Sequence, residues 1–231
     1  MHRIDLTPVY VLHTRPFRNT SLIVELFSKT YGRISVVARS ARGPQSRYQG
    51  QCQLFTPILA SWSGHHELKM LGNIELNGMP LQLNDKPLFC GFYFNELLMR
   101  LLHKEDPHPL LFEHYHNSLC RLEKGDPIAQ TLRSFEKKLL HDLGYGLPLT
   151  HEAKTHTVIQ CDRYYEFVPN QGFFACDSTS NNHTYFLGAD LIAISEEKFD
   201  SDSAALSAKR LMRLALSSLL GNKPLNSREL F

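Results

Sequence analysis

Short runs of β-branched and aromatic residues, separated by turn residues, fill the first third of the chain. This pattern predicts five strands, at residues 7–14, 21–28, 33–39, 53–62 and 67–76. Five strands at this spacing indicate a small closed barrel. A five-stranded Greek-key barrel of about 75 residues has the size of an OB-fold. An SH3-like barrel fits the strand count nearly as well.

Beyond residue 84 the apolar period changes from two to about 3.6, which predicts helices over 86–103, 109–124, 127–143 and 202–220. The third has the clearest signals, with Asp126 placed to cap it, Pro127 at its first position and Gly144 after its end. Residues 147–186 indicate an irregular β-rich insert. The expected fold is therefore α+β and multi-domain, with an OB-fold nucleic-acid-binding domain at 1–80 and a helical domain at 81–231 that contains the insert.

Composition is ordinary for a globular protein, with 42% apolar and 21% charged residues among 231. Apolar runs stay well short of the ~18 residues that would span a bilayer, so no membrane association is expected. The N-terminal residues lack the pattern of a secretory signal, which favours a cytoplasmic protein, associated with the nucleoid when it acts. Five widely spaced cysteines predict reduced, buried thiols and no disulfide framework.

Positive charge is concentrated at one end of the sequence. Residues 1–60 hold eight Lys or Arg against Asp5 and Glu25, a net charge of +6, whereas the whole chain carries +2 and residues 61–231 therefore sum to −4. The segment 39–51 has three arginines and no acid, and we expect a mobile basic loop there. Such asymmetry predicts a polyanionic partner, because Lys and Arg placed against phosphate release counterions. A solvated surface is the alternative. The residues expected to contact DNA are Arg15, Arg33, Arg39, Arg42, Arg47 and, by stacking, Tyr48.

Motifs for catalysis are missing from the sequence. It contains neither of the common Gly-rich phosphate loops and no Gly-x-Ser-x-Gly elbow. His114 and His116 are two residues apart on a predicted helix, so they face different sides and do not predict a shared metal. The insert has possible ligands but no Cys-x-x-Cys or His-x-x-x-His pair, and we expect no metal, no cofactor and no catalytic residue. Those possible ligands are His151, His156, Cys161, Cys176 and His183.

Several short strings of residues are similar to those of one family. The chain resembles the bacterial DNA repair protein RecO over nearly its whole length. The resemblance implies an N-terminal OB-fold, a helical C-terminal domain and a non-enzymatic recombination mediator. The strings are Tyr31-Gly32-Arg33, Ala38-Arg39-Ser40-Ala41-Arg42-Gly43, Leu54-Phe55-Thr56-Pro57, Leu143-Gly144-Tyr145-Gly146 and Gly221-Asn222-Lys223-Pro224-Leu225-Asn226-Ser227-Arg228-Glu229-Leu230.

The resemblance also implies partners. Proteins of this kind bind and anneal single- and double-stranded DNA, and act with RecR to load RecA onto DNA coated by the single-stranded-DNA-binding protein SSB. Many relatives have a four-cysteine zinc module in the insert, whereas here only Cys161 and Cys176 occur there. We therefore expect a member that has lost the metal. A metal-assisted hydrolase and a protein-binding adaptor remain alternatives.

SSB ends in a short acidic peptide with an apolar aromatic residue and a free carboxylate. Its receptor needs an apolar slot rimmed by cations. Two predicted helices supply cations beside apolar stripes, although such cations are also normal on the solvated back of a helix. The residues expected to bind this tail are Arg133, Lys137, Lys209, Arg210 and Arg213, with Lys138 beside them.

Overall fold

The computed structural model describes residues 3–176 and 184–230. By compactness the chain divides into one unit made of residues 1–125 and 225–231 and a second made of residues 126–224. The sequence-based division at residue 80 follows the change from strands to helices, whereas the compact units follow packing and group the first two helices with the strands.

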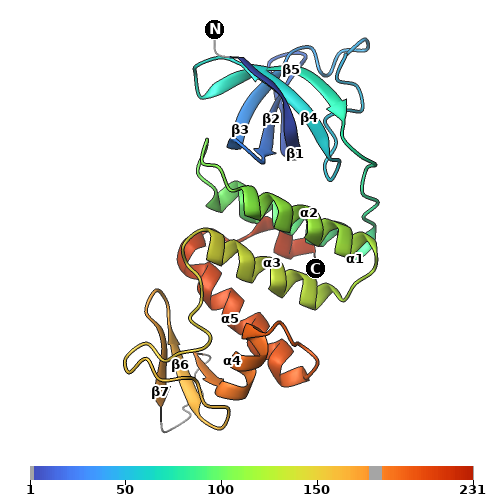
Figure 1. The fold of residues 1–231 in the computed structure, drawn as a ribbon. Helices are drawn as coiled ribbons and strands as arrows, with labels where there is room; N and C mark the ends of the chain where they lie inside the picture. Colours follow the sequence, from blue (N-terminus) through green and yellow to red (C-terminus); the bar gives the residue numbers. More distant parts are fainter. Residues whose placement is uncertain (1–2, 177–183, 231) are drawn as a thin grey trace. The chain divides into compact units, whose positions relative to one another are not determined.

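The N-terminal strands close into a barrel (Figure 1). Their order around it is β1-β2-β3-β5-β4, with β4 returning to pair with β1, which confirms the OB-type barrel. The prediction for β2 matches, whereas β1 extends three to four residues further at each end and β4 begins five residues later than expected. The strands are β1 (Arg3–Phe17), β2 (Ser21–Ser28), β3 (Gly32–Ala38), β4 (Ile58–Ser63) and β5 (Leu68–Leu76).

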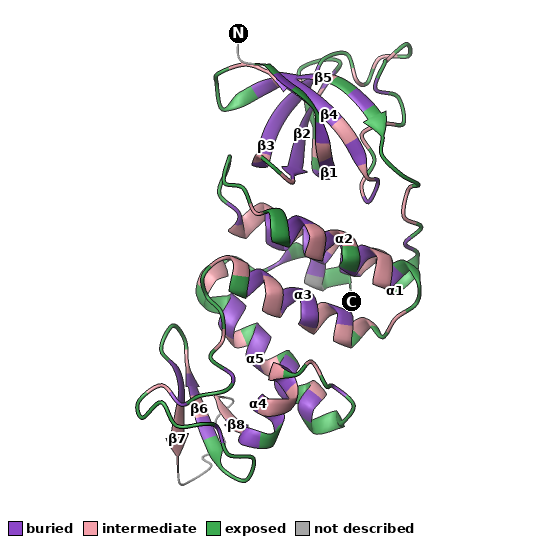
Figure 2. Cartoon of the chain, viewed as in Figure 1, coloured by how far each residue is buried: buried purple, intermediate pink, exposed green. Residues whose placement is uncertain are grey.

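The barrel strands have buried residues on both faces, drawn purple in Figure 2, whereas the outer face of an uncovered barrel would be exposed to solvent. One face of each strand fills the interior, where Val9 and Val11 of β1 meet Val24 and Leu26 of β2 around Trp62. Alternate residues point outward, and on β1–β3 many of these are buried too. Something other than the barrel must cover that outer face.

Two helices, α1 (Asp85–Leu101) and α2 (Pro109–Glu123), cover it. Tyr10 and Phe27 lie opposite each other on β1 and β2, and both rings pack against Phe112 and Tyr115 of α2 at centroid distances of 5.1–6.2 Å. Tyr10 is 1% exposed and Phe27 is fully buried. Aromatic pairs of this kind contribute ~0.5–1.5 kcal/mol each beyond the area they bury. The helices are thus fixed to the barrel by a hydrophobic face.

A β-bulge in β1 adds a polar link. The register of β1 against β2 shifts between Val11 and His13, which takes the carbonyl of Leu12 out of the ladder. The side-chain amide of Asn95 on α1 donates to that carbonyl at 3.0 Å, and the hydroxyl of Tyr115 donates to the Asn95 side-chain oxygen at 2.6 Å. One buried chain of hydrogen bonds therefore joins β1, α1 and α2.

The string Tyr31-Gly32-Arg33 belongs to the same contact. Arg33 donates through Nε to the carbonyl of Leu102 and pairs with the buried Glu25 at 3.5 Å. Gly32 has a φ of +68°, and a β-carbon there would overlap the carbonyl oxygen of Asp106 in the α1–α2 connection. Glycine is needed twice at this position, once for its backbone angle and once for the close approach.

Replacing Gly32 by alanine is therefore expected to destabilise the protein. The left-handed backbone alone costs ~1–2 kcal/mol for a residue with a β-carbon, and overlap with backbone adds to it. Gly125 is the matched control, because its φ is +82° and a β-carbon added there would have no other atom within 4 Å. Thermal unfolding should show a clearly larger loss of stability for Gly32→Ala than for Gly125→Ala. Equal losses would mean that the α1–α2 connection does not constrain position 32.

The second unit contains three helices and a small sheet. The helices are α3 (Ile128–Asp142), α4 (Gly188–Ser195) and α5 (Asp202–Leu220), and the sheet orders its strands β7-β6-β8, with β6 (Tyr164–Val168), β7 (Gly172–Cys176) and β8 (Tyr185–Leu187). The bounds of α5 match the prediction, and the sheet falls in the predicted insert. Pro127 stands at the N-cap of α3, where Asp126 was expected. The sequence pattern did not predict α4.

The last residues return to the first unit and form the 3-10 helix η1 (Asn226–Leu230) against α1. The Glu96 carboxylate on α1 accepts the backbone N–H of Asn226 at 2.9 Å, and the N–H and hydroxyl of Ser227 at 2.8 and 2.6 Å. Partial burial opposes ionisation of this carboxyl, but these hydrogen bonds hold the pKa of Glu96 below its usual range.

Because its pKa is lowered on folding, Glu96 stabilises the fold above the unfolded pKa of about 4.3 and loses this contribution as the pH falls below it. Glu96→Gln removes the charge at every pH. Protection of the Asn226 and Ser227 amides, measured relative to their intrinsic exchange rates at each pH, should therefore fall in the variant at pH 7, and in the wild type only in acid. Glu229→Gln, in the same segment, is the control and should leave both amides unchanged. Unchanged protection of these amides in Glu96→Gln would show that the Glu96 carboxylate does not hold the C-terminal segment.

Neither a membrane span nor a disulfide is found in the part of the chain that the structure describes. In those ranges, no helix combines the length and the apolar character that crossing a membrane requires. None of the five cysteines, all of which lie in the described ranges, is joined in a disulfide. Cys90 is buried, but Cys161 is exposed, so the expectation that the thiols are buried is wrong for that residue.

Candidate nucleic-acid interface

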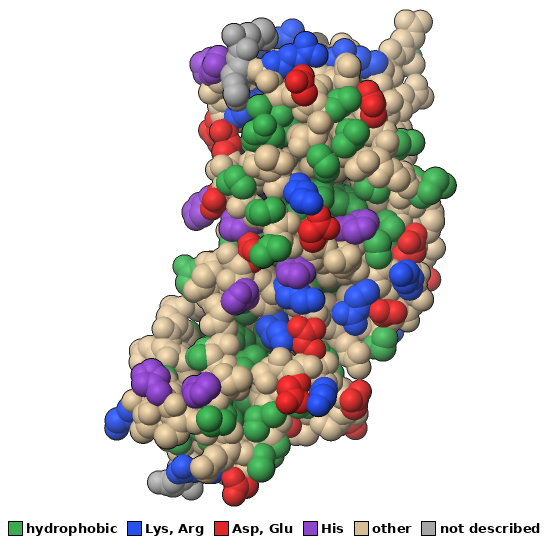
Figure 3. All heavy atoms as spheres, viewed as in Figure 1, with side chains coloured by type: hydrophobic (Ala, Val, Ile, Leu, Met, Phe, Trp, Pro, Cys, Tyr) green, Lys and Arg blue, Asp and Glu red, His purple; other side chains and the backbone are tan. Residues whose placement is uncertain are grey.

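One end of the barrel is formed by the β1–β2 hairpin and by the segment 39–53 that leads from β3 toward β4. Strand pairing brings these parts together, since Phe17 pairs with Ser21 and Leu22 with Ala38. This end carries five exposed arginines, Arg15, Arg18, Arg39, Arg42 and Arg47. From residue 26 to residue 66 the chain contains no acidic residue. Figure 3 shows Lys and Arg side chains gathered along the end of the barrel drawn at the top.

Local hydrogen bonds shape the basic segment into successive turns. Backbone N–H groups of Gly43, Ser46 and Gln49 each donate to the carbonyl three residues before them. The segment is attached to the hairpin by Arg42, whose backbone N–H donates to Thr20 and whose guanidinium donates to the carbonyls of the hairpin turn. In the structure of this segment, which we expected to be a mobile loop, specific contacts are made at its start and in its middle.

The middle contact is Tyr48. Its side chain is 4% exposed and belongs to the barrel core, where its hydroxyl donates to the carbonyls of Leu71 at 2.8 Å and Gly72 at 3.0 Å. The structure therefore places Tyr48 inside the barrel, where it cannot stack on a base, contrary to expectation. Arg47 lies over the Tyr48 ring, with its guanidinium carbon 4.7 Å from the centroid, and is itself exposed.

Arg33 also differs from expectation. Its side chain is 15% exposed, forms an ion pair with Glu25 and donates a hydrogen bond to the carbonyl of Leu102. The hydroxyl of Ser35 donates to both Glu25 oxygens at 2.9 Å, so the buried carboxylate is fully engaged. Removing one partner of a buried ion pair typically costs ~3–5 kcal/mol. Arg33 therefore belongs to the joint between barrel and helices.

The usual ligand surface of an OB-fold is the face of its second and third strands together with two connecting loops. Here that face is covered by α1 and α2, and burial raises the pKa of the Tyr10 hydroxyl, whose partner is His116. The exposed remainder is the hairpin end. Of the residues expected to contact DNA, Arg15, Arg39, Arg42 and Arg47 lie there, whereas Arg33 and Tyr48 do not.

Comparisons with known proteins identify the family of this chain. Residues 1–79 match the family model "Recombination protein O N terminal" and residues 86–229 match "Recombination protein O C terminal". The chain belongs to the RecO family. It is similar to "DNA repair protein RecO" from Coxiella burnetii (strain RSA 493 / Nine Mile phase I), with 49% identity over 99% of this chain and 98% of the relative. The protein of that name from Cellvibrio japonicus (strain Ueda107) is 40% identical over 99% and 97% of the two chains. A DNA repair role is therefore supported for this RecO-family protein.

Three of the cations expected to bind a partner tail are engaged within the second unit. Arg133 pairs with the buried Glu136 at 3.0 Å and is 13% exposed. Lys137 donates to the carbonyls of Ile194 and Ser195 at the end of α4, and pairs with Glu197 at 3.0 Å. Lys137 thereby holds α3 to α4 in this RecO-family chain.

Arg210 is the third. Its guanidinium donates to the carbonyl of Tyr185 at 2.6 Å and lies 4.4 Å from the Phe186 ring centroid. Lys209 and Arg213, by contrast, are exposed on α5. They stand four residues apart and so share one stripe of the helix, which continues to the exposed Ser217.

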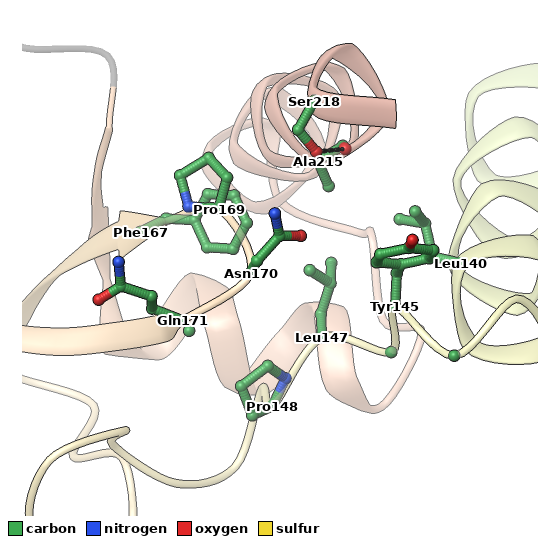
Figure 4. Close-up of a pocket in the computed structure, with 13 residues that line it drawn as sticks. Leu140, Tyr145, Leu147, Pro148, Phe167, Pro169, Asn170, Gln171, Ala215 and Ser218 are labelled. Carbon is green, nitrogen blue, oxygen red and sulfur yellow. Dashed lines mark hydrogen bonds between the residues drawn. The ribbon is translucent and has the colours of Figure 1, made fainter. Parts of the chain in front are cut away.

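A hollow of about 380 Å³ lies beside the end of that stripe. Tyr145 and Phe167 face each other across it, with Asn170 between them, and Ala215 and Ser218 of α5 close another side (Figure 4). Leu140, Leu147, Pro148 and Pro169 also line it. The hollow therefore combines an aromatic and proline-rich wall with exposed amide groups.

Possible metal ligands in the insert do not converge. Across residues 3–176 and 184–230, no group of three or more His, Cys, Asp or Glu side chains is placed to hold a metal ion. Cys161 is exposed, and Cys176 ends β7 opposite Tyr164. His183 lies outside the described residues. The sheet is instead packed by aromatic rings, with Phe173 5.2 Å from Phe167 and 6.3 Å from Phe186.

Sequence reasoning left Arg18 out of the expected DNA contacts, although it named Phe17 among the barrel aromatic residues that could stack on bases. Arg18 and Phe17 form the tip of the β1–β2 hairpin, and the Arg18 guanidinium carbon lies 5.2 Å from the Phe17 ring centroid. The string Arg-Pro-Phe-Arg-Asn indicated only a turn. Phe17 stands two residues after Arg15 and so shares its face of β1, which was the available signal for this residue.

Proposed function

We propose that this protein is a non-enzymatic mediator of recombinational DNA repair. It binds single- and double-stranded DNA through the arginine-rich barrel end, anneals complementary strands, and acts with RecR to load RecA onto SSB-coated DNA. Membership of the RecO family supports the role. The observation that carries the DNA contact is the set of five exposed arginines on one end of a barrel whose nearest acid in β2, Glu25, is buried in its own ion pair.

The charge distribution explains why such a surface suits annealing. Two phosphate backbones repel each other, and a protein that neutralises both releases their condensed counterions. Arginines on a hairpin and on a neighbouring segment can contact two strands from one rigid body. The contact needs no base-specific group, which fits a protein that must act on any sequence.

Binding measured across a salt series tests this proposal. The triple variant Arg15→Ala, Arg39→Ala, Arg47→Ala should bind single-stranded DNA more weakly. Its log-log salt slope should be shallower by ~0.7 per lost contact, or about 2 in all. Lys86→Ala, Lys124→Ala, Arg163→Ala removes the same charge from exposed positions elsewhere and should keep the wild-type slope.

If the folded triple variant has the same salt slope as the wild type, the barrel end is not the DNA-binding surface. A wild type that binds no DNA would favour the protein-binding adaptor. Cleavage of the oligonucleotide that depends on added metal would favour the hydrolase.

We further propose that the second unit binds the acidic tail of SSB along α5. Lys209 and Arg213 can pair with the acidic residues, and the apolar end of the tail fits the hollow lined by Tyr145, Leu147 and Phe167. Four residues of helix, about 6 Å, separate Arg213 from Ser217, the neighbour of Ser218 at the hollow. Arg133, Lys137 and Arg210 support this surface through their internal contacts.

Fluorescence anisotropy of a labelled tail peptide tests the location. Lys209→Ala, Arg213→Ala should weaken binding by about two- to thirtyfold at low salt, because each of the two exposed ion pairs contributes ~0.2–1 kcal/mol. Lys154→Ala is the control for an exposed cation away from α5. If Arg133→Ala and Arg210→Ala weaken binding in folded protein while the double variant does not, the tail lies on the other side of these helices.

A further inference from the structure

The outer face of β1–β3 continues past the helices that cover it. His13 pairs with Glu25 and Arg15 with Ile23, and directly opposed residues point to the same side of a sheet. Glu25 points outward, since it meets Arg33 and Ser35 outside the barrel interior. By alternation Arg15 and Phe17 point outward too. The face that is buried around Tyr10 and Phe27 thus continues to Arg15, which is exposed, and to Phe17, which is half-buried.

Phe17 differs from every other aromatic residue of the barrel. Of the seven aromatic residues in the described part of the barrel, residues 3–79, five are buried. Tyr31 packs edge-on to Trp62 at 5.5 Å against the core. Phe17 is half-buried and is not among the residues of the barrel-interior cluster. The five buried residues are Tyr10, Phe27, Tyr48, Phe55 and Trp62.

Cations surround this ring. Arg18 lies over it at 5.2 Å, and Arg15 is two residues earlier on the same strand. Arg39 directly follows Ala38, which pairs with Leu22 beside Phe17's partner Ser21, so it lies about two strand spacings, ~10 Å, from Phe17. An aromatic ring flanked by Arg side chains is the arrangement by which proteins hold single strands, since it stacks a base and neutralises its backbone.

The hairpin tip is also held in place. Arg18 adopts a φ of +51°, a conformation unfavourable for a residue with a side chain. The guanidinium of Arg42 donates to the carbonyls of Arg18 at 2.9 Å and Asn19 at 2.6 Å, and its backbone N–H donates to Thr20 at 2.8 Å. Arg42 is thus a positioning residue, which fixes the tip against the basic segment.

We propose that Phe17 is a stacking site for one unpaired nucleobase, with Arg18 turning from the ring to the adjacent phosphate. This proposal rests on the proposed DNA contact at the barrel end. Such a stacking site favours single strands, because bases inside a duplex already stack on each other and do not offer a free face. Arginines alone make no such distinction, since both kinds of DNA carry phosphates.

Tryptophan fluorescence tests stacking directly. The chain has one tryptophan, Trp62, which is 2% exposed, so Phe17→Trp adds an accessible reporter. Oligo-dT should quench the emission of Phe17→Trp, whereas a blunt duplex bound to the same extent should not. Leu110→Trp, at a 67% exposed position of α2, is the control and should be quenched by neither.

Affinity supplies an independent measurement. Phe17→Ala should lose at least about fivefold in affinity for oligo-dT, with its salt slope and its affinity for duplex unchanged, because no charge is removed. Phe17→Tyr should restore binding, which guards against loss of folding as the cause.

Three results would overturn the stacking site: unquenched Phe17→Trp on bound oligo-dT, equal losses of single-strand and duplex affinity in Phe17→Ala, or no loss at all. In each of these cases the proposed function would still stand if the triple arginine variant had a shallower salt slope than the wild type. A wild type without DNA binding would remove both.

Discussion

Burial of the outer barrel face under α1 and α2 is the constraint on which the rest of the structure depends. It uses the aromatic pair Tyr10 and Phe27, and it needs the ion pair of Glu25 and Arg33 because a carboxylate on that face cannot reach water. It also accounts for Gly32, beside which the α1–α2 connection passes. The surface that most OB-folds offer to a ligand thereby becomes an internal joint.

This joint limits where the proposed DNA contact can lie. With the middle of the strand face covered, only the part that extends past the helices remains, and there the chain places arginines without acids. The proposed contact is narrow and electrostatic, so we expect its strength to fall steeply with salt. Weak, reversible binding would suit the proposed mediator, which leaves the DNA after its task.

The sequence predicted the periodic elements well and the roles of single side chains poorly. Alternation and turn residues located the five strands of the barrel, and the 3.6-residue period located four helices within a few residues. Helix α4 has only eight residues, about two turns, which is too few for a period to be recognised. Tyr48 was assigned to the DNA surface because it stands in the basic segment, and Arg33 because it is one of the cations that make the N-terminal region positive. Their partners, Leu71, Gly72 and Leu102, lie 23 to 69 residues away. No local pattern records such pairs, and the same holds for Arg210.

The return of the C-terminal segment to α1 makes the second unit an insertion within the first in chain order. During synthesis, residues 1–125 leave the ribosome long before Asn226 and Ser227 are made. The carboxylate of Glu96 then waits without its three donors while about a hundred residues of another unit are added. The barrel unit is consequently both the first to begin folding and the last to be completed.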